Sequence, residues 1–311
     1  MAVALSDRRD ERPFPHTVPR RKFLIIRNSH AGLKSARLVG NVAEALAVRG
    51  AEARIVETQC ADAVRDTLRD APDVDAVVVA GGDGTVRAMA LTLNDMGLDL
   101  AIGLIPAGTG NVLANEVGLP RNAERLADLL IGGDARKLHI MQANGAPFLL
   151  MASSGFDAEV LLRLSVRLKQ RVARAAYALP TLAALAQNVP APFDTMIDGK
   201  RYAATWVIIT NARTYGSRFT LVRDTSIFDD RLQAVLFSAR SRLGRMKELL
   251  WLAAGHAERC ASVSVIACQR AEILAPRHMP SQIDGDGLGF GPVSVEPSGR
   301  TLRLIVPTDA R

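Results

Sequence analysis

The sequence has few cysteines, few aromatic residues and no long apolar run. Its three cysteines, Cys60, Cys260 and Cys268, lie far apart and form no Cys-x-x-Cys pair. They therefore support neither a disulfide framework nor a zinc site, and they fit a reducing cytoplasm. No segment reaches the roughly 18–20 apolar residues that span a bilayer, so any membrane contact is expected to be peripheral. Aromatic residues make up 5% of the chain, which is poor material for base-stacking platforms and argues against nucleic acid as a partner.

Several familiar motifs are also missing. There is no P-loop of the form Gly-x-x-x-x-Gly-Lys-[Ser/Thr], and no Gly-x-Gly-x-x-Gly follows a strand pattern. Neither Gly-x-Ser-x-Gly nor His-Glu-x-x-His occurs. The five histidines are scattered, and each is interpreted as structural or exposed. The remaining candidates for a catalytic or binding site are the glycine turns and the carboxylates.

The chain is rich in positive charge. Its 311 residues carry a net charge of +7 with a pI near 9.8. This excess indicates an anionic partner, such as a nucleotide or an acidic lipid surface, although it can equally serve solubility alone. Residues 1–20 are polar and rich in Arg and Pro, without an apolar segment suited to a signal sequence. We interpret them as a disordered basic tail.

The clearest motif is a glycine turn. Residues 81–85 read Gly-Gly-Asp-Gly-Thr, after an apolar strand pattern at 74–80 and before a helical pattern at 85–95. Glycines let a backbone approach a ligand closely, and the first amides of a helix favour an anion, usually phosphate. A tight turn with a solvated Asp83 is the alternative interpretation.

Residues 21–135 are predicted to form an α/β domain. Strand patterns at 22–27, 53–57, 74–80 and 100–105 alternate with helical patterns, which indicates a parallel, doubly wound sheet. In such sheets ligands bind beyond the carboxyl ends of the strands. The turns 28–32, 81–85 and 106–111, together with Thr58, all follow strands, so we expect them to cluster at one edge.

Residues 136–297 are predicted to form a β-rich, largely antiparallel domain. Two helical insertions are expected, near 158–187 and 241–255. The first pairs an apolar stripe with a neighbouring arginine stripe and could lie on an anionic membrane or pack on the protein. The short β-like runs lie at 136–143, 147–152, 203–210, 232–238, 260–268, 271–275 and, beyond residue 297, 301–306.

Carboxylates accompany the glycine turns. Asp83 lies in the central turn, Asp229-Asp230 precede a late strand pattern, and residues 282–286 read Gln-Ile-Asp-Gly-Asp. Phosphoryl transfer needs phosphate positioning, a divalent cation and a proton acceptor. Carboxylates hold Mg²⁺ beside substrate phosphates, and one can act as general base.

Four segments together resemble a known family. They are 81–85, 106–111 (Pro-Ala-Gly-Thr-Gly-Asn), 154–158 (Ser-Gly-Phe-Asp-Ala) and 284–286 (Asp-Gly-Asp). In this order and spacing they resemble the diacylglycerol kinase catalytic-domain family, which includes bacterial lipid kinases and sphingosine kinases. The resemblance implies an α/β plus β fold. An N-terminal domain like that of 6-phosphofructokinase and NAD kinase precedes a C-terminal β-rich sandwich, and residues 298–311 return to the first domain.

The resemblance also implies an activity: γ-phosphate transfer from ATP, with Mg²⁺, to the hydroxyl of a diacylglycerol-like or long-chain-base lipid at the cytoplasmic membrane face. Asp286 would act as general base, Asp83 would contact phosphate or metal, and Asp157 would face the lipid. Asp229 would hold a second-domain metal with main-chain oxygens of Ser226 and Arg231. The residues implied to line the nucleotide are Asn28, Thr58, Gly81, Gly82, Asp83, Gly84, Thr85, Val86, Arg87, Gly108, Thr109 and Asn111.

The chain departs from the family pattern at several positions. Arg87 stands where the family often has Asn, Asp230 where it usually has Gly, and Asp286 where it has Glu. Two other functions stay open: a soluble-substrate kinase of the NAD kinase type and a non-catalytic nucleotide-sensing protein. The oligomeric state is open as well, with a homodimer as one arrangement.

Overall fold

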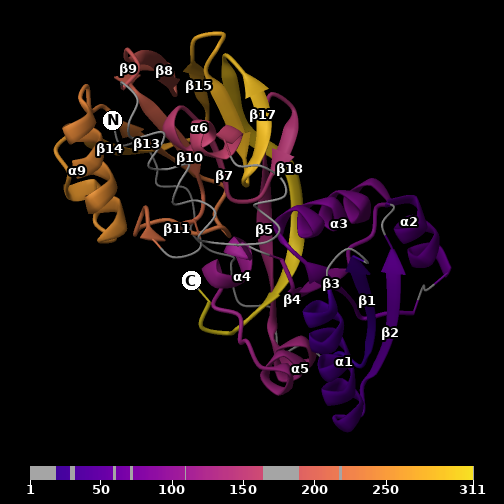
Figure 1. Cartoon of the computed structure of the whole chain (residues 1–311). Helices are drawn as coiled ribbons and strands as arrows, with labels where there is room; N and C mark the ends of the chain where they lie inside the picture. The colour runs from indigo at the N-terminus through magenta and orange to yellow at the C-terminus, as the bar shows by residue number, and fades with distance from the viewer. Residues whose placement is uncertain are drawn as a thin grey trace, which may run out of the picture.

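The chain folds into two connected parts, a lower α/β part and an upper β-rich part (Figure 1). The computed structural model describes residues 19–28, 32–58, 61–70, 73–108, 110–163, 189–216 and 219–310. The basic tail up to residue 18 and most of the expected helix 158–187 lie outside the described residues. None of the helices in the described part is long and apolar enough to cross a membrane.

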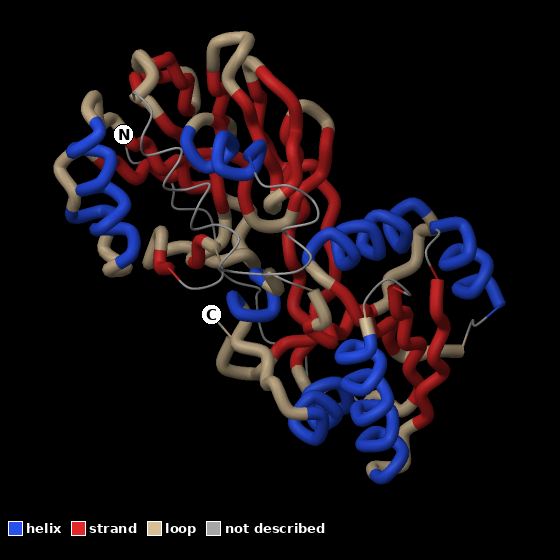
Figure 2. The backbone as a smooth tube through the Cα atoms, viewed as in Figure 1, coloured by secondary structure: helices blue, strands red, loops and turns tan. Residues whose placement is uncertain are grey.

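The lower part is built on four parallel strands in the order β2-β1-β3-β4. The central strand β3 consists entirely of buried residues, and its neighbour β1 carries four consecutive buried apolar residues, Phe23 to Ile26, as expected for strands covered on both faces. Figure 2 shows helices on both sides of this sheet. The elements are β1 (Lys22–Asn28), α1 (Leu33–Val48), β2 (Glu52–Thr58), α2 (Ala61–Asp70), β3 (Ala76–Gly81), α3 (Asp83–Asp95), β4 (Ala101–Pro106), α4 (Val112–Glu116) and α5 (Ala123–Gly132).

The helices pack in two layers. Apolar side chains of α1 and α5 form one core with the sheet, and those of α2 and α3 form another on the opposite face. Val86, Met89 and Leu93 of α3 recur at helical spacing and are all buried. This confirms the doubly wound sheet that the alternating patterns predict.

Two long strands connect the parts. β18 (Val293–Val306) pairs antiparallel with β5 (Asp134–Ala143) along most of its length. Its first residues also pair with β15 (Ala271–Leu274) of the upper part, and its last residues run parallel to β4 of the lower part. One sheet therefore runs continuously from β2 to β9 through both parts.

The upper part is a sandwich. The upper end of that sheet packs face to face with a second, antiparallel sheet of order β14-β13-β10-β7-β16-β17, and apolar side chains from both fill the space between them. Its elements are β6 (Ala146–Phe148), β7 (Met151–Ser154), α6 (Phe156–Arg163), β8 (Phe193–Ile197), β9 (Lys200–Ala204), β10 (Trp206–Thr210), β11 (Thr214–Tyr215), β12 (Phe219–Thr220), β13 (Leu232–Phe237), α9 (Arg242–Ala253), η2 (Ala257–Arg259), β14 (Val263–Cys268), β16 (Pro280–Ile283) and β17 (Asp286–Phe290).

Two expected strands are each divided in two. The run 203–210 breaks at Thr205, whose hydroxyl donates to the carbonyls of Phe237 and Ala239. At this point the chain leaves the first sheet at β9 and enters the second at β10. The run 147–152 breaks at Leu149 and Leu150, because their amides donate to a carboxylate instead of a strand. The expected helix near 241–255 is confirmed as α9.

Candidate functional site

The glycine turn 81–85 links β3 to α3. Gly82 takes the N-cap position of α3, and no side chain caps that helix end. A Cβ on Gly81 would lie 2.7 Å from Thr85 Oγ1, so glycine is what allows the chain to turn this tightly. The first turn of α3 lies just beyond the carboxyl end of a central strand, which is where such folds bind anions.

The turn after β4 lies directly against this first turn. A Cβ on Gly108 would lie 2.5 Å from the Cα of Gly82, and the amide of Ala107 donates to the carbonyl of Gly81 at 3.2 Å. Asn111 stabilises the second turn: its side chain accepts from the Gly108 amide and donates to the Gly108 carbonyl, both at 2.8 Å. Thr109 lies outside the described residues.

Asn28 and Thr58 end the two neighbouring strands. They are register partners at the last pair of β1 and β2. β1 lies beside β3, and β2 lies beside β1, in the same parallel sheet. Both residues therefore lie at the edge that carries the glycine turns. The side chain of Val86, a residue of α3, is buried in the core, so any contact that Val86 makes with a ligand would be through its backbone.

Asp83 binds the start of the next short helix. Its two carboxylate oxygens accept the amides of Val112 and Leu113, each at 3.0 Å. These are the first two residues of α4, so Asp83 satisfies amides that the helix itself leaves without partners. Burial raises the pKa of Asp83, and the two amides oppose that shift. The carboxylate therefore locks the two glycine turns together.

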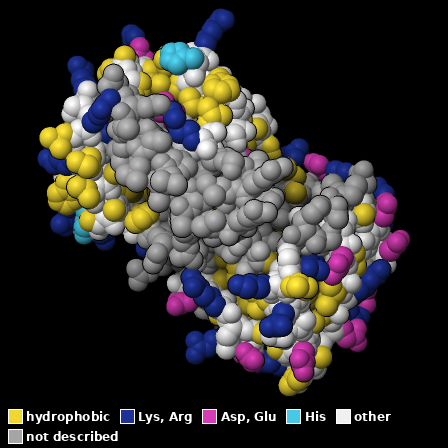
Figure 3. Space-filling model, in the orientation of Figure 1, with side chains coloured by type: hydrophobic (Ala, Val, Ile, Leu, Met, Phe, Trp, Pro, Cys, Tyr) yellow, Lys and Arg dark blue, Asp and Glu magenta, His cyan; other side chains and the backbone are white. Residues whose placement is uncertain are grey.

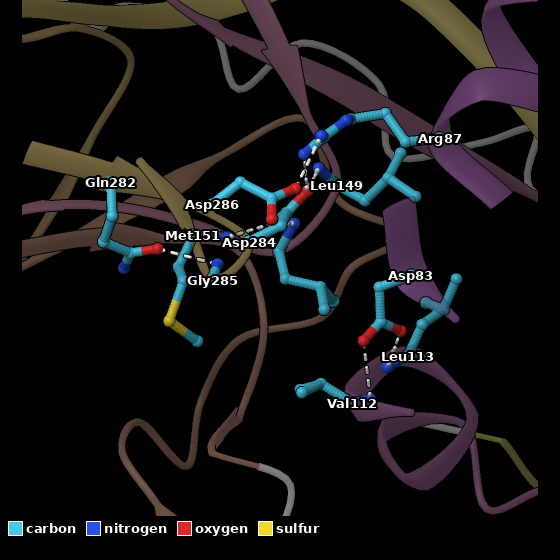
Figure 4. A network of polar contacts seen from close by, with 11 residues as sticks. Asp83, Arg87, Val112, Leu113, Leu149, Met151, Gln282, Asp284, Gly285 and Asp286 are labelled. Atoms are coloured by element: carbon cyan, nitrogen blue, oxygen red, sulfur yellow. Dashed lines mark hydrogen bonds and ion pairs between the residues drawn. The ribbon is translucent and has the colours of Figure 1, made fainter. Parts of the chain in front are cut away.

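Two further acids, Asp284 and Asp286, reach the site from the far end of the chain (Figure 4). Arg87, one helical turn after Asp83, contacts Asp286 at 3.0 Å and Asp284 at 3.4 Å. A Cβ on Gly84 would lie 3.8 Å from Oδ2 of Asp286. The hairpin turn between β16 and β17 is thus positioned against the first turn of α3.

Asp284 and Asp286 have different surroundings. The side chain of Asp284 is 1% exposed and accepts the backbone amides of Leu149, Leu150 and Met151 at 2.8 to 3.1 Å. Burial raises its pKa, and the amides and Arg87 oppose the rise. The side chain of Asp286 is 56% exposed. Asp284 is therefore a structural anchor, whereas Asp286 is open to a reactant.

Asp157 is the centre of a buried network in the upper part. It accepts from the Ser153 hydroxyl at 2.6 Å, the Trp206 indole at 3.0 Å and the Gln282 amide at 3.2 Å. Burial raises its pKa, and these donors oppose the shift. The residue is 5% exposed, so in this structure it joins α6 to β16 and does not face solvent.

The residues implied for a second metal lie on an exposed turn before β13. The amide of Asp229 donates to the carbonyl of Ser226 at 3.0 Å, and Asp229 and Arg231 are exposed. Across the described residues, no group of three or more His, Cys, Asp or Glu side chains is arranged to hold a metal ion. Any cation here or at the glycine turns would need main-chain, water or phosphate oxygens as well.

Two residues that hold the site together were given no role from the sequence. Glu116, at the end of α4, is buried and accepts the amides of Arg213 and Thr214 at 2.7 and 2.9 Å, which ties the lower part to β11. Asp284 appeared only as a neighbour of Asp286. Its signal was the Asp-Gly pair, since Asp284 and Gly285 both have positive φ and form a tight hairpin turn.

The arrangement combines four features that phosphoryl transfer uses. It has amides at a helix start, a cation at Arg87, a partly solvated carboxylate at Asp286 and a rigid frame made by Asp83 and Asp284. The cation and the amides can hold phosphate oxygens, and the solvated carboxylate can accept a proton.

Comparison with known proteins identifies the two parts. Residues 22–143 match the family model described as the diacylglycerol kinase catalytic domain, and residues 151–306 match the one described as the YegS C-terminal NAD kinase beta sandwich-like domain. These matches confirm the resemblance seen in the motifs and the predicted pairing of an α/β domain with a β-rich sandwich.

Relatives are similar over most of the chain. "Diacylglycerol kinase" of Bacillus subtilis (strain 168) is 24% identical over 265 residues, 84% of this chain and 88% of the relative. "Probable lipid kinase YegS-like" of Enterobacter sp. (strain 638) is 27% identical over 243 residues, 76% and 79% of the two chains. A crystal structure of a diacylglycerol kinase from Bacillus anthracis has a TM-score of 0.67 at 18% identity, covering 94% of this chain and 99% of that one, which shows a shared fold.

Proposed function

The chain belongs to the diacylglycerol kinase catalytic-domain family, and on that premise we propose that it is an ATP- and Mg²⁺-dependent lipid kinase. It transfers the γ-phosphate to the hydroxyl of a diacylglycerol-like or long-chain-base lipid at the cytoplasmic membrane face. The observation that carries the proposal is the position of Asp286, which the fold brings against Gly84 of the glycine turn although 202 residues separate them in the sequence.

ATP would bind across the two glycine turns. The close approach of Gly82 and Gly108 leaves backbone amides, with no side chains between them, at the start of α3. Arg87 adds a cation one turn further along the helix, and guanidinium groups bind phosphate oxygens in two-point contacts. Asn28, Thr58, Thr85 and Asn111 lie at this edge and would line the rest of the nucleotide together with Thr109.

Asp286 would accept the proton of the lipid hydroxyl. The acceptor oxygen attacks the γ-phosphorus, the bond from that phosphorus to the bridging oxygen breaks, and ADP leaves with the electron pair. The 56% exposure of Asp286 leaves room for a hydroxyl, whereas three amides already occupy Asp284. Arg87 holds Asp286 in place until a phosphate competes for the guanidinium.

Mg²⁺ would be held by Asp83 and by phosphate oxygens. Each Asp83 oxygen accepts one amide and keeps a second lone pair, so the carboxylate fits a cation that takes its remaining ligands from phosphate and water. When bound, Mg²⁺ neutralises charge on the transferring phosphate. A separate cation on the turn before β13 would use Asp229 with the main-chain oxygens of Ser226 and Arg231.

The test is a transfer assay with labelled ATP, Mg²⁺ and a panel of diacylglycerols, long-chain bases and NAD. We expect lipid-dependent transfer that Asp286→Asn abolishes while ATP affinity and melting temperature stay near wild type. Asp224→Asn is the matched control, because Asp224 is also an exposed carboxylate of the upper part and lies outside the site. Transfer by wild type that Asp284→Asn removes but Asp286→Asn leaves intact would assign the base to the buried acid.

A soluble-substrate kinase of the NAD kinase type is the second candidate. The description of the matched C-terminal model as NAD kinase beta sandwich-like favours it. Labelled phosphate on NAD, with none on any lipid, would decide for this candidate. Binding of ATP without transfer to any acceptor would instead indicate a nucleotide-sensing protein.

A further inference from the structure

The helix α9 (Arg242–Ala253) buries an ion pair and exposes three large apolar side chains. Its inward face carries Arg245 and Glu248, which are 3% and 0% exposed and contact each other at 3.2 Å, one turn before the buried Leu252. Its outward face carries Leu243, Met246 and Leu250, which are 73%, 45% and 65% exposed. A surface helix normally shows the opposite arrangement, with apolar residues facing the core.

The inward charges are built into the fold. Glu248 accepts the amide of Ala239 at 2.9 Å, and Arg245 donates to the Thr205 hydroxyl at 2.7 Å. Thr205 lies at the crossing between the two sheets, so these bonds fix the rotation of α9 about its own axis. The apolar residues are therefore held outward by the core and cannot turn inward without breaking a buried ion pair.

The outward face forms one continuous apolar stripe with positive edges. Positions 243, 246 and 250 fall within 60° of one another at 100° per residue, and Arg242 and Lys247 lie on either side of them. The only acid of α9 is Glu248, which is buried, so the exposed face carries no negative charge. Figure 3 shows hydrophobic side chains with Lys and Arg beside them along the left edge of the upper part, where Figure 1 places α9.

We propose that this face of α9 docks the protein on an anionic phospholipid bilayer, with Leu243, Met246 and Leu250 inserted at the level of the headgroups. Helices of this pattern lie flat in the interface, with their apolar side embedded and their cations reaching the lipid phosphates. The proposal deepens the proposed function, since it rests on a lipid acceptor that a membrane presents, and it adds a surface separate from the phosphate site.

The charges and the size of the face favour a bilayer over a second copy of this chain. A specific protein interface buries about 800 Å² per partner, and three partly exposed side chains supply only a fraction of that area. A second copy would also bring Arg242 and Lys247 of both chains together, because a two-fold interface pairs the same patch with itself. Anionic headgroups complement these cations.

The test is sedimentation of the full chain with vesicles, without ATP. Vesicles of phosphatidylcholine with 30% phosphatidylglycerol, on the order of the anionic content that gives a strong surface potential, are compared with pure phosphatidylcholine. We expect wild type to bind the anionic vesicles, Leu243→Ser/Leu250→Ser to bind them at least tenfold more weakly, and Lys247→Glu about fivefold more weakly. Val48→Ser is the matched control, because Val48 is 79% exposed on a helix of the lower part, and it should bind like wild type.

Melting temperatures and light scattering separate the other outcomes. All variants should melt near wild type, since they change exposed side chains. Equal vesicle binding by wild type and the double variant would overturn the proposal. So would a wild-type dimer that the double variant converts to monomer. Loss of binding in the double variant, in a protein that phosphorylates no lipid, would leave the docking surface intact and refute the proposed function alone.

Discussion

Replacement of Asp284 by alanine should destabilise the upper part far more than the same change at Asp286. The side chain of Asp284 is 1% exposed and satisfies the amides of Leu149, Leu150 and Met151. Each buried amide left without a partner costs about 1–3 kcal/mol. Water entering the vacated space recovers part of this cost, so we expect a loss of about 3–5 kcal/mol in the free energy of unfolding.

Asp286→Ala is the matched control, one glycine further along the chain. Its side chain is 56% exposed and its main partner is Arg87, and exposed ion pairs contribute about 0–1 kcal/mol. The two variants remove the same group and share Arg87, so the difference between them reports the three amides together with the positive φ of Asp284, which alanine tolerates less well than aspartate. Asp286→Ala should instead lose transfer activity at nearly unchanged stability.

Equilibrium urea unfolding, followed by tryptophan fluorescence, measures the difference. Both tryptophans, Trp206 and Trp251, lie in the upper part that Asp284 anchors. A loss below about 1 kcal/mol for Asp284→Ala, or equal losses for the two variants, would refute the assignment of Asp284 as the anchor of this turn.

Three further changes test other parts of the site. Arg87→Ala removes the cation shared by Asp284 and Asp286 and should weaken ATP affinity at least tenfold, measured by titration calorimetry, whereas Arg87→Lys should retain part of it. Gly108→Ala places a Cβ 2.5 Å from Gly82 and should cost about 1–3 kcal/mol of stability with loss of ATP binding; Gly110→Ala, whose Cβ meets nothing closer than 3.7 Å, should melt near wild type. Asp157→Asn tests the raised pKa of Asp157. Because the folded state holds its proton to higher pH than the unfolded state, wild type should gain stability relative to Asp157→Asn as pH falls from neutrality towards about 4. Parallel unfolding curves of the two proteins across this range would contradict the shift.

The lower part was predictable because its signals are local. β1 and β3 are buried on both faces and read as continuous apolar runs, and α3 shows its buried face at helical spacing. The turn 81–85 carries its own chemistry in five adjacent residues. Strand and helix bounds therefore differ from the predicted ones by only a few residues.

Three strands, β8, β16 and β17, are not among those predicted from the sequence, and their clearest sequence signal is a turn and not an apolar run. β8, β16 and β17 end or begin at tight turns made by an Asx-Gly pair, and such a turn also joins β5 to β6. In each pair both residues have positive φ, at 144–145, 198–199 and 284–285, as the type I′ hairpin requires. The side chains of β17 do not alternate between buried and exposed, because the strand contains two glycines and lies at a sheet edge. Its apolar pattern in the sequence is therefore weak.

The partners of the buried acids could not be read from the sequence. Asp284 binds amides about 134 residues away, and Glu116 binds amides 97 residues away. A backbone amide has no residue-type signal, so nothing in positions 149–151 or 213–214 indicates that a carboxylate approaches. The same applies to Arg87, whose two acids lie on the far side of the domain boundary.

The relative position of the two halves of the site depends on β18 and β5. No separate linker holds the glycine turns against Asp286, because the same pair of strands belongs to both parts. The register of that pair shifts between Pro297 and Thr301, after the residues of β18 that join β15 and before those that join β4. A strand pair bends most easily at such an irregularity. Any closure of the upper part over a bound nucleotide would therefore bend the sheet at 297–301 and leave the bonds of Asp83 and Asp284 within each part intact. The contacts that cross between the parts, among them those of Arg87 and Glu116 and the apolar packing of Ile227 and Phe228 in a core shared with the lower part, would have to adjust.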